Sequence, residues 1–321
     1  MSGWRPGANR ARLQLRARLL LETRDFFAAR GVLEVDTPLL AQCGASDVHL
    51  ASLSTRIAGR AQPYFLQTSP EYAMKRLLAA GSGDIYQVCK AFRDGESGRL
   101  HNPEFTLIEW YRLGFDHHRL MDEVEELLRR LLSARLTAAA ERISYADAFR
   151  RVLGLDPFAA PLAALATLAS ERLGAPPALA ADGRDALLDL LMGALVGPAL
   201  GAGRITFVHD YPASQAALAR LLPGEPACAA RFEAYVAGLE LCNGFHELAD
   251  AAEQRRRFES DLRRRAQLGL PPMPVDERLL AALAAGFPEV AGVALGFDRV
   301  LMLAAGASNL GEVLAFTVDE A

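Results

Sequence analysis

The stretch that decides the fold runs from Phe92 to Tyr111 and reads FRDGESGRLHNPEFTLIEWY. Residues 85–93, which lead into it, and residues 104–113, which end it, have the composition of β-strands, and the Gly, Asp and Ser residues between them favour a turn. Strand alternation puts four side chains of the second run on one face: Phe105, Leu107, Glu109 and Tyr111. Because charged side chains are rarely buried without partners, the pattern predicts a nucleotide-handling β-hairpin beside a charged pocket.

The segment GVALGFDR at residues 292–299 has the composition of an apolar strand that passes through Gly296 into a helix from Asp298 to Ala305. Gly296 has no β-carbon and so allows the backbone to approach a ligand closely. Arg299 falls in the first helical turn, where the free backbone N–H groups favour anions. This segment therefore predicts a second element that contacts an anionic ligand.

These two segments resemble motifs 2 and 3 of the class II aminoacyl-tRNA synthetases, and GVLEVDTP at residues 31–38 resembles motif 1, which serves dimerisation in that family. Three further stretches are similar to lysyl-tRNA synthetases: SPE at 69–71, HNPEFT at 101–106 and ELCNGFHEL at 240–248. The resemblance implies an ATP-dependent homodimer of the α+β class, with an antiparallel sheet flanked by helices. The predicted strands favour the same fold class, because they do not follow a strict βαβ alternation.

A lysyl-tRNA synthetase carries an anticodon-binding barrel before motif 1, and residues 1–30 are too few for a five-stranded barrel. We therefore expect a single catalytic domain over residues 12–321, with a helical insertion near 137–203 and no anticodon-binding domain. A bare catalytic domain of this kind is similar to the elongation factor P–(R)-β-lysine ligase family. These are paralogues of lysyl-tRNA synthetase that modify a protein lysine instead of tRNA.

Composition gives weaker information. Hydrophobic residues make up 51% of the chain and charged residues 23%, as in an ordinary globular protein with a large core. The net charge of −4 leaves no overall basic footprint for nucleic acid. The four cysteines show no paired spacing, and the absence of a signal-peptide pattern or a long apolar run predicts a cytoplasmic protein without a membrane partner. Only two of the 35 Lys and Arg residues are lysines, Lys75 and Lys90, which we attribute to coding bias.

Arg93 and Arg299 are the candidate catalytic residues, which the resemblance puts at the α- and γ-phosphates of ATP. A guanidinium is planar and permanently charged, which suits the grip needed as charge builds up during adenylate formation. The family commonly has a glutamate two residues after the first arginine, where this chain has Gly95 followed by Glu96. Either the loop shifts and Glu96 contacts adenine, or only the backbone of Gly95 does. The set implied for ATP is Arg93, Asp94, Gly95, Glu96, Asn102, Glu240, Leu241, Gly296 and Arg299.

Glu240 and Glu247 resemble the magnesium-binding glutamates of the family. Magnesium prefers oxygen ligands and usually shares them with nucleotide phosphates. Seven residues apart, the two glutamates would lie on opposite faces of a regular strand, so we expect a bend at Asn243-Gly244 to bring both inward. His101 either assists at the phosphates or only caps its strand.

Several carboxylates in one pocket suit a substrate with two ammonium groups, whereas a substrate carboxylate would need cationic or neutral donors. Glu71 has a competing capping role near the start of its helix. Ala294 stands where lysyl-type synthetases usually have glycine. Its methyl group either narrows the space beside the α-carbon, which favours β-lysine over α-lysine, or packs into the core. The set implied for the amino acid is Ser69, Pro70, Glu71, Glu109, Tyr111, Asn243, Glu247 and Ala294.

The resemblance therefore implies activation of (R)-β-lysine by ATP as an adenylate and its transfer to a lysine of elongation factor P, with magnesium as cofactor and no stable tRNA binding. Alpha-lysine is a second candidate substrate. Three alternatives stay open: a truncated lysyl-type enzyme acting on tRNA or a free small molecule, a synthetase helped by a separate anticodon-binding chain, and a non-catalytic regulatory subunit. Four intact charged residues argue against the last: Arg93, Glu240, Glu247 and Arg299.

Overall fold

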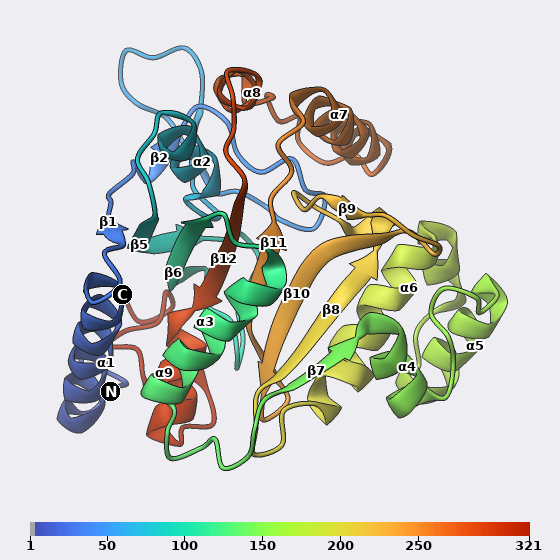
Figure 1. Ribbon diagram of the computed structural model, residues 1–321, viewed down its shortest axis with the longest axis horizontal. Coiled ribbons are helices and arrows are strands. Elements are labelled where there is room, and N and C mark those ends of the chain that lie inside the picture. The colour runs from blue at the N-terminus through green and yellow to red at the C-terminus, as the bar shows by residue number, and fades with distance from the viewer. Residues whose placement is uncertain (1–3) are drawn as a thin grey trace. The chain divides into compact units, whose positions relative to one another are not determined.

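The computed structural model describes residues 4–321, and the chain forms two compact units that are described one at a time. The first unit comprises the chain up to Leu132 together with Glu247–Ala321, and the second comprises Ser133–His246. The blue and the red elements of Figure 1 both belong to the first unit. The helical stretch expected near 137–203 falls within the second unit.

Helices and a four-strand run of sheet make up most of the first unit. Its helices are α1 (Arg10–Ala28), α2 (Glu71–Ala79), α3 (His117–Leu131), α7 (Ala251–Gln267), α8 (Glu277–Ala284), α9 (Phe297–Ala305) and the 3-10 helix η5 (Leu310–Glu312). Its strands are β1 (Leu33–Glu34), β2 (Leu40–Ala41), β3 (Ser54–Thr55), β4 (Tyr64–Leu66), β5 (Ile85–Phe92), β6 (Glu104–Leu113) and β12 (Val290–Gly296). The strands follow the order β1-β5-β6-β12, with a separate small sheet β2-β4-β3. Helix α1 contacts both α3 and α9 (Figure 1).

The predicted hairpin is confirmed, because β5 and β6 pair antiparallel with Gln87 opposite Glu109. Strand β12 pairs antiparallel with the other edge of β6, and Ala294 lies opposite Glu109 while Gly292 lies opposite Tyr111. Directly paired residues of antiparallel strands point to the same face of a sheet. These five positions therefore share one face, which becomes the floor of the site.

The sequence Ser69-Pro70-Glu71 predicts a helix that opens there and runs to Ala80, and α2 confirms it. Its apolar residues form one cluster with residues of the sheet, and the members are Met74, Leu78, Ile85, Tyr111 and Val290. Burial of these side chains is the main stabilising contribution here, at about 1.5–3 kcal/mol for each large apolar group. The cluster holds the start of α2 against the face of the sheet that carries Tyr111.

The second unit combines short helices with a sheet of its own strands. Its helices are α4 (Tyr145–Leu153), α5 (Leu162–Leu173), α6 (Arg184–Leu191), the 3-10 helices η1 (Pro177–Asp182), η3 (Gly197–Ala199) and η4 (Ala213–Gln215), and the π-helical turn η2 (Met192–Val196). Its strands are β7 (Glu141–Ser144), β8 (Thr206–Pro212), β9 (Leu221–Leu222), β10 (Cys228–Val236) and β11 (Leu239–His246). They follow the order β11-β10-β8-β7, and β9 pairs with β10.

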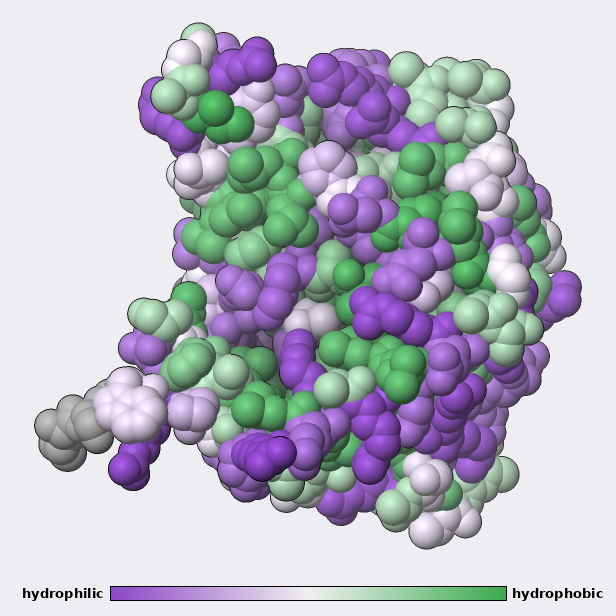
Figure 2. All heavy atoms as spheres, turned by 90° about the vertical axis from the view of Figure 1, so that its left-hand side faces the viewer, coloured by the Kyte–Doolittle hydropathy of each residue, from purple (hydrophilic) through white to green (hydrophobic). Residues whose placement is uncertain are grey.

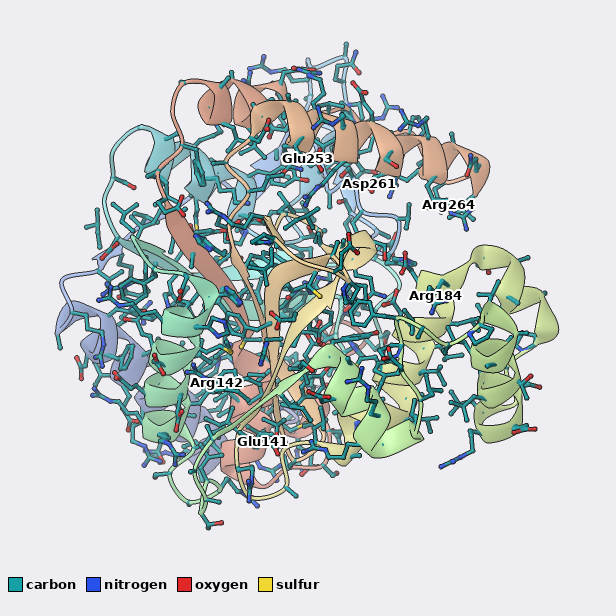
Figure 3. The ribbon with its side chains drawn as sticks, turned by 45° about the vertical axis from the view of Figure 1, so that its right-hand side comes forward. Glu141, Arg142, Arg184, Glu253, Asp261 and Arg264 are labelled. Atoms are coloured by element: carbon teal, nitrogen blue, oxygen red, sulfur yellow. The ribbon has the colours of Figure 1, made fainter. Side chains whose placement is uncertain are left out.

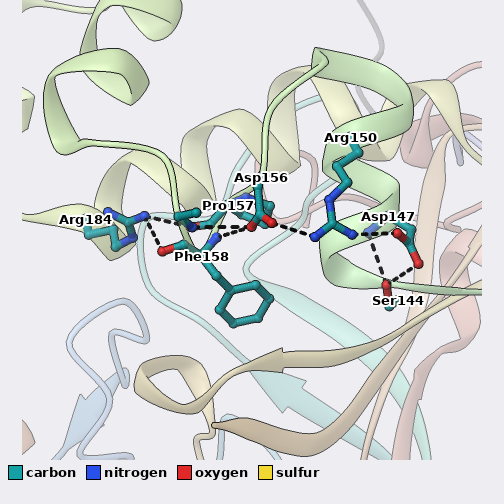
Figure 4. Close-up of polar contacts among 8 residues, drawn as sticks. Ser144, Asp147, Arg150, Asp156, Pro157, Phe158 and Arg184 are labelled. Carbon is teal, nitrogen blue, oxygen red and sulfur yellow. Dashed lines mark hydrogen bonds and ion pairs between the residues drawn. The ribbon is translucent and has the colours of Figure 1, made fainter. Parts of the chain in front are cut away.

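Charged contacts hold the segment between α4 and α6 in place (Figure 4). Arg150 contacts Asp156 at 2.5 Å. Arg184 donates hydrogen bonds to the carbonyl oxygens of Pro157 at 2.9 Å and Phe158 at 3.1 Å. Both arginines thus hold the loop between α4 and α5, in a region whose Ala- and Leu-rich composition is typical of scaffold.

The sequence of residues 232–241 predicts one continuous strand, and that prediction is wrong. The chain instead forms the hairpin of β10 and β11, with Ala237 and Gly238 at the turn. Both residues have positive φ, 52° and 77°, which two-residue hairpin turns of this kind require. Alanine rarely adopts that conformation, so the sequence lacks the usual Asn-Gly signal for the turn.

The α+β fold class is confirmed, and antiparallel pairing dominates the sheet within each unit. Two pairs are parallel, β1 with β5 and β7 with β8. None of the helices in residues 4–321 has both the length and the apolar character needed to cross a membrane.

Five exposed leucines of the first unit lie in or beside α1, β1, β2 and the end of β6. They are Leu21, Leu33, Leu39, Leu40 and Leu113. Figure 2 looks onto the side that carries α1, β1 and β2 in Figure 1, and hydrophobic areas interrupt its hydrophilic surface. Leu33 is 56% exposed although β1 is a strand of the sheet. Strand edges with exposed apolar residues are common sites of association between chains.

Candidate active site

Glu109 is the centre of a buried polar cluster on the shared face of β6 and β12. The residue is only 2% exposed. The Ser69 hydroxyl donates to Oε2 of Glu109 at 2.7 Å, and the Tyr111 hydroxyl donates to Oε1 at 2.7 Å. Oγ of Ser69 also accepts a hydrogen bond from the backbone N–H of Glu71 at 3.1 Å. This bond spans Pro70 and fixes the start of α2. The structure thus brings together Ser69, Glu109 and Tyr111, as predicted.

The ionisation of Glu109 is strongly perturbed. Burial, together with the neighbouring Glu71, raises the pKa of Glu109 to about 8, although its hydrogen bonds from Ser69 and Tyr111 act in the opposite direction. Burial, together with the carboxylates of Glu109, Glu71 and Glu247, also holds the pKa of Tyr111 well above its usual range. A cationic group placed beside Glu109 would favour its ionised form. The cluster is therefore suited to bind an ammonium group.

Lys75 is a site residue that sequence reasoning missed. Its ammonium lies 2.7 Å from Oε1 of Glu71 and 2.6 Å from Oε2 of Glu247, and its side chain is 1% exposed. Burial alone would lower the pKa of Lys75, but Glu247 and Glu71 raise it overall. Two signals were available: its position four residues after Glu71 on a helix, and its rarity as a lysine in an arginine-rich chain.

Gly292 is the second missed residue. A β-carbon at Gly292 would lie 2.6 Å from Oε1 of Glu247 and would also overlap the ring of Tyr111. Contacts this short do not occur in folded proteins, so only glycine leaves room for both groups here. The glycine was visible in the motif 3-like segment, but the sequence could not reveal its neighbours.

Ala294 lies directly opposite Glu109 in the pairing of β12 with β6. It is partly exposed, whereas Val293 and Leu295, which point to the other face, are buried. This placement favours the interpretation of Ala294 as a wall of the pocket over the alternative of core packing. Its methyl group faces the same side of the sheet as the Glu109 carboxylate.

Arg93, Arg299 and His101 form a second group of candidate residues in the first unit. The Arg93 guanidinium lies over the ring of Phe105 at 5.0 Å, and its Nε is buried without a hydrogen-bond partner among residues 4–321. Nη2 of Arg299 lies 2.8 Å from Nε2 of His101. Burial and the charge of Arg299 lower the pKa of His101. A buried guanidinium Nε without a hydrogen-bond partner is the feature expected of an arginine that binds an anionic ligand.

The motif 2-like loop places Glu96 towards Arg93, with Oε1 3.7 Å from Nη1. Gly95 has a φ of 76°, a conformation that favours glycine, and the backbone N–H of Asp94 donates to the carbonyl of Ala51 at 2.8 Å. The alternatives for adenine, Glu96 with a shifted loop or the backbone of Gly95, remain open. The charged pair with Arg93 shows that Glu96 reaches the same region as the candidate phosphate ligand.

Asn102 has a structural role that the sequence did not reveal. Its Nδ2 donates to the carbonyl of Glu104 at 2.6 Å, and its Oδ1 accepts the backbone N–H of Val318 at 3.0 Å. The amide thus braces the hairpin through Nδ2 and ties it to the C-terminal segment through Oδ1. These bonds use one of the two Nδ2 hydrogens, so the other can donate to a nucleotide without breaking either bond.

The helix that presents Arg299 is anchored by its neighbour Asp298. Oδ2 of Asp298 accepts the backbone N–H of Thr106 at 2.7 Å, and Oδ1 accepts from Arg16 at 2.6 Å. Gly296 ends β12 immediately before this helix, as predicted. Asp298 therefore links the first turn of α9 to β6 and to α1, and so fixes the backbone position of the adjacent Arg299.

Glu240, Leu241 and Asn243 lie on β11 of the second unit. Leu241 has no partner on β10 and forms a bulge, whereas pairing at Asn243-Gly244 is regular. The bend predicted at Asn243-Gly244 is therefore wrong. The bulge at Leu241 shifts the alternation by one residue and puts Glu240 on the same face of β11 as Asn243. Leu241 itself is buried, so only its backbone is available to a ligand.

Glu240 borders a polar cavity of about 160 Å³ within the second unit, where Asp189, Arg231 and Glu233 are also among the lining residues. Arg231 donates to Oδ1 of Asn243 at 3.2 Å and to Glu233 at 2.6 Å. These contacts neutralise Arg231 and orient the amide of Asn243. Glu240 is therefore part of a polar surface and not of the apolar core.

The two arginine triplets of the sequence lie on α7, which Figure 3 marks by Glu253, Asp261 and Arg264. Glu253 accepts from Arg256 at 2.7 Å and from Arg257 at 2.9 Å. Asp261 accepts from the hydroxyl of Ser46 at 2.9 Å. Much of the positive charge of α7 is thus paired within the first unit.

The comparisons with known proteins agree with these observations. The model of the class II tRNA synthetases (D, K and N) matches residues 3–320. The elongation factor P–(R)-β-lysine ligase of Edwardsiella ictaluri is 51% identical over 325 residues, which cover 100% of this chain and 99% of the relative. Proteins of the same name from Klebsiella pneumoniae subsp. pneumoniae and Erwinia tasmaniensis are 50% and 51% identical and cover 99% of this chain and 98% of their own.

Proposed function

The chain belongs to the class II tRNA synthetases (D, K and N) and, within them, to the elongation factor P–(R)-β-lysine ligases, and we propose that it performs the ligation which that name describes. It is an ATP-dependent, AMP-forming ligase. ATP activates (R)-β-lysine as an adenylate, and the enzyme then transfers the β-lysyl group to a lysine side chain of elongation factor P.

The buried carboxylates of the first unit carry this proposal. Glu109 is held by Ser69 and Tyr111, and Glu71 and Glu247 meet at Lys75. A pocket with this excess of negative charge selects a substrate with two ammonium groups and disfavours aspartate or asparagine, whose side chains need cationic or neutral donors. Ala294 beside Glu109 supports β-lysine over α-lysine, because its methyl group takes space at the wall of the pocket.

In the first step an oxygen of the substrate carboxylate attacks the α-phosphorus of ATP, and the bond to the β-phosphate breaks to release pyrophosphate. We assign Arg93 to the α-phosphate and Arg299 to the γ-phosphate, where each guanidinium offsets the charge of the transition state. His101 and Asp298 position Arg299 through the contacts described above. No side chain acts as a covalent nucleophile, since orientation and charge neutralisation suffice.

In the second step the neutral amine of a lysine on elongation factor P attacks the activated carbonyl. The new amide bond forms, the bond from the carbonyl to the phosphate oxygen breaks, AMP leaves, and the amine loses its proton. The chain supplies positioning for this step, and the leaving phosphate stays near Arg93.

Magnesium fits the donor set, and we assign it to Glu240 and Glu247 with the ATP phosphates as further ligands. Among residues 4–321, no three His, Cys, Asp or Glu side chains are grouped to hold an ion by themselves, so the nucleotide must complete the coordination. Oε2 of Glu247 is paired with Lys75, so this ammonium would also hold the carboxylate that binds the ion. When bound, magnesium neutralises the triphosphate charge.

We further propose a cytoplasmic homodimer that acts as one catalytic domain over residues 12–321 and does not bind tRNA stably. The exposed leucines around β1 support association between two copies. The runner-up function is activation of α-lysine for tRNA by a truncated lysyl-type enzyme.

Mass spectrometry tests the function directly. Purified protein, ATP, magnesium and (R)-β-lysine are incubated with elongation factor P, and parallel reactions contain α-lysine or bulk tRNA. We expect elongation factor P to gain the mass of one lysyl residue at a lysine, fastest with β-lysine. Charging of tRNA at physiological salt with unmodified elongation factor P would favour the runner-up, and the absence of any pyrophosphate exchange would favour a regulatory subunit.

A further inference from the structure

Lysine is nearly absent from this chain, yet one of its two lysines lies at the centre of the candidate pocket. Lys90, the other, pairs with Glu104 at 3.1 Å, and both side chains are more than 40% exposed. The Lys75 side chain is 1% exposed and lies between the carboxylates of Glu71 and Glu247. Arginine fills the other 33 of the 35 Lys and Arg positions, so a lysine placed between the carboxylates of Glu71 and Glu247 points to a requirement for its shape.

The geometry explains this requirement. An ammonium is a compact point charge with three donors, and it can contact two carboxylates at 2.7 and 2.6 Å from a single atom. A guanidinium is larger and planar, and it cannot take the same place without moving them. Glu71 lies on α2 with Lys75, whereas Glu247 enters the first unit from a distant part of the sequence. One ammonium therefore ties α2 to the segment that begins at Glu247.

The formal charges of the pocket provide a second argument. Glu71, Glu109 and Glu247 contribute three negative charges when ionised, and Lys75 contributes one positive charge. Counted without the magnesium ion and its nucleotide, the difference is two negative charges, which matches the two ammonium groups of a lysine-type substrate. Buried ions are costly unless they are paired, so an uncompensated third charge would disfavour the arrangement.

We propose that Lys75 is a positioning residue of the amino-acid pocket, and this inference rests on the proposed function. Lys75 holds one oxygen of Glu71 and one of Glu247 and thereby fixes the orientation of both carboxylates at the pocket. It also sets the charge of the pocket to that of a diammonium ligand. Oε1 of Glu247 points towards Gly292, on the face that carries Ala294, which agrees with this orientation.

The test compares Lys75→Met, Lys75→Arg and the matched surface control Lys90→Met in pyrophosphate exchange, with the KM of (R)-β-lysine and of ATP measured separately. Lys75→Met keeps an unbranched side chain that is one atom shorter, and it removes the charge. We expect its KM for β-lysine to rise about tenfold to a hundredfold and its KM for ATP to stay within about twofold. Lys75→Arg restores the charge and should recover part of the loss, while Lys90→Met behaves as the wild type.

An unchanged KM for β-lysine in Lys75→Met would overturn the proposal, as would an equal rise in both KM values with a lowered melting temperature, since that indicates a merely structural role. If Lys75→Met does not fold, Lys75→Arg decides: a raised KM for β-lysine alone supports the proposal, and two unchanged values refute it. Wild-type protein in the same assay distinguishes a failure of the proposed function from a failure of the role assigned to Lys75. If it does not activate β-lysine, the proposed function fails, and calorimetric binding of α-lysine to wild type and to the two Lys75 variants then tests the pocket, with equal affinities refuting the role of Lys75.

Discussion

Ala294 lies directly opposite Glu109 across the antiparallel pairing of β12 and β6, with both side chains on the face that forms the pocket. The methyl group of Ala294 is therefore placed to limit the space available beside a ligand of Glu109. Ala294→Gly should raise the activation of α-lysine relative to β-lysine. Because one methyl group is worth about 1–3 kcal/mol in such a pocket, the ratio of the two kcat/KM values should change about tenfold to a hundredfold.

Pyrophosphate exchange with each amino acid provides the measurement, and Glu109→Gln is the matched control for charge. The Gln variant should weaken both substrates, since it removes a carboxylate that balances an ammonium group. An unchanged ratio in Ala294→Gly would mean that the methyl group has no part in selectivity. The preference for β-lysine would then rest on the likeness to the ligases alone.

Elements set by local pattern could be predicted from the sequence. The hairpin of β5 and β6, the start of α2 at Ser69-Pro70 and the transition from β12 to α9 each depend on strand alternation, capping or a nearby glycine. The positions of Ser69, Glu109 and Tyr111 in one cluster followed from these elements and the resemblance. Such features require no knowledge of contacts between distant parts of the chain.

What failed depends on contacts between distant segments or on unusual backbone. The ion pair of Lys75 with Glu247 joins residues that are 172 positions apart (247 − 75), and no periodicity of the sequence predicts such a pair. The hairpin turn at Ala237-Gly238 uses an alanine with positive φ, for which the sequence has no common signal. The bulge at Leu241 inserts one residue into a strand of ordinary composition, so its position was misjudged by two residues.

Gly292→Ala should distort the floor of the pocket. The added β-carbon would lie 2.6 Å from Oε1 of Glu247 and overlap the Tyr111 ring, so at least one of these groups must move. Overpacking of this kind costs about 1–3 kcal/mol. We expect kcat/KM for β-lysine in pyrophosphate exchange to fall about tenfold or more, with a modest fall in melting temperature by circular dichroism. Full activity would show that Glu247 and Tyr111 can shift without loss of function.

Arg299→Ala and Glu240→Ala should each reduce adenylate formation by about a hundredfold or more without unfolding the chain, because each removes charge stabilisation at the phosphates. For Glu240→Ala, a higher magnesium concentration should restore part of the rate if the residue binds the ion. The control is Arg151→Ala, which loses a half-exposed pair with Glu141 at 2.7 Å and should retain its rate. Near-normal exchange in either test variant would contradict the assigned role.

Leu33→Asp should weaken the homodimer. Leu33 is 56% exposed on β1, next to the motif 1-like segment, and a charge there would have to be desolvated in an interface between two copies. Light scattering coupled to size-exclusion chromatography should show a dimer for the wild type and a shift towards monomer for the variant. Leu268→Asp, at an exposed position after α7, serves as the control and should not shift. A monomeric wild type would refute the proposed dimer.

The final prediction concerns pH. Burial and Glu71 raise the pKa of Glu109 to about 8, so Glu109 is mostly protonated in the free enzyme at pH 7. The ammonium of the substrate favours the carboxylate, and binding therefore releases a proton. Affinity for β-lysine should increase as pH rises from about 6.5 to about 8, by up to about tenfold per pH unit, because less work is then needed to ionise Glu109.

Calorimetry of β-lysine binding in buffers of different ionisation enthalpy measures the proton release directly. Glu109→Gln has no proton to release at this position, so its weaker binding should vary little with pH over the same interval. Near pH 10 the substrate amines themselves lose protons, and affinity should fall in both proteins. The sign is the critical result: binding by the wild type that weakens between pH 6.5 and 8 would mean that Glu109 does not meet the substrate ammonium.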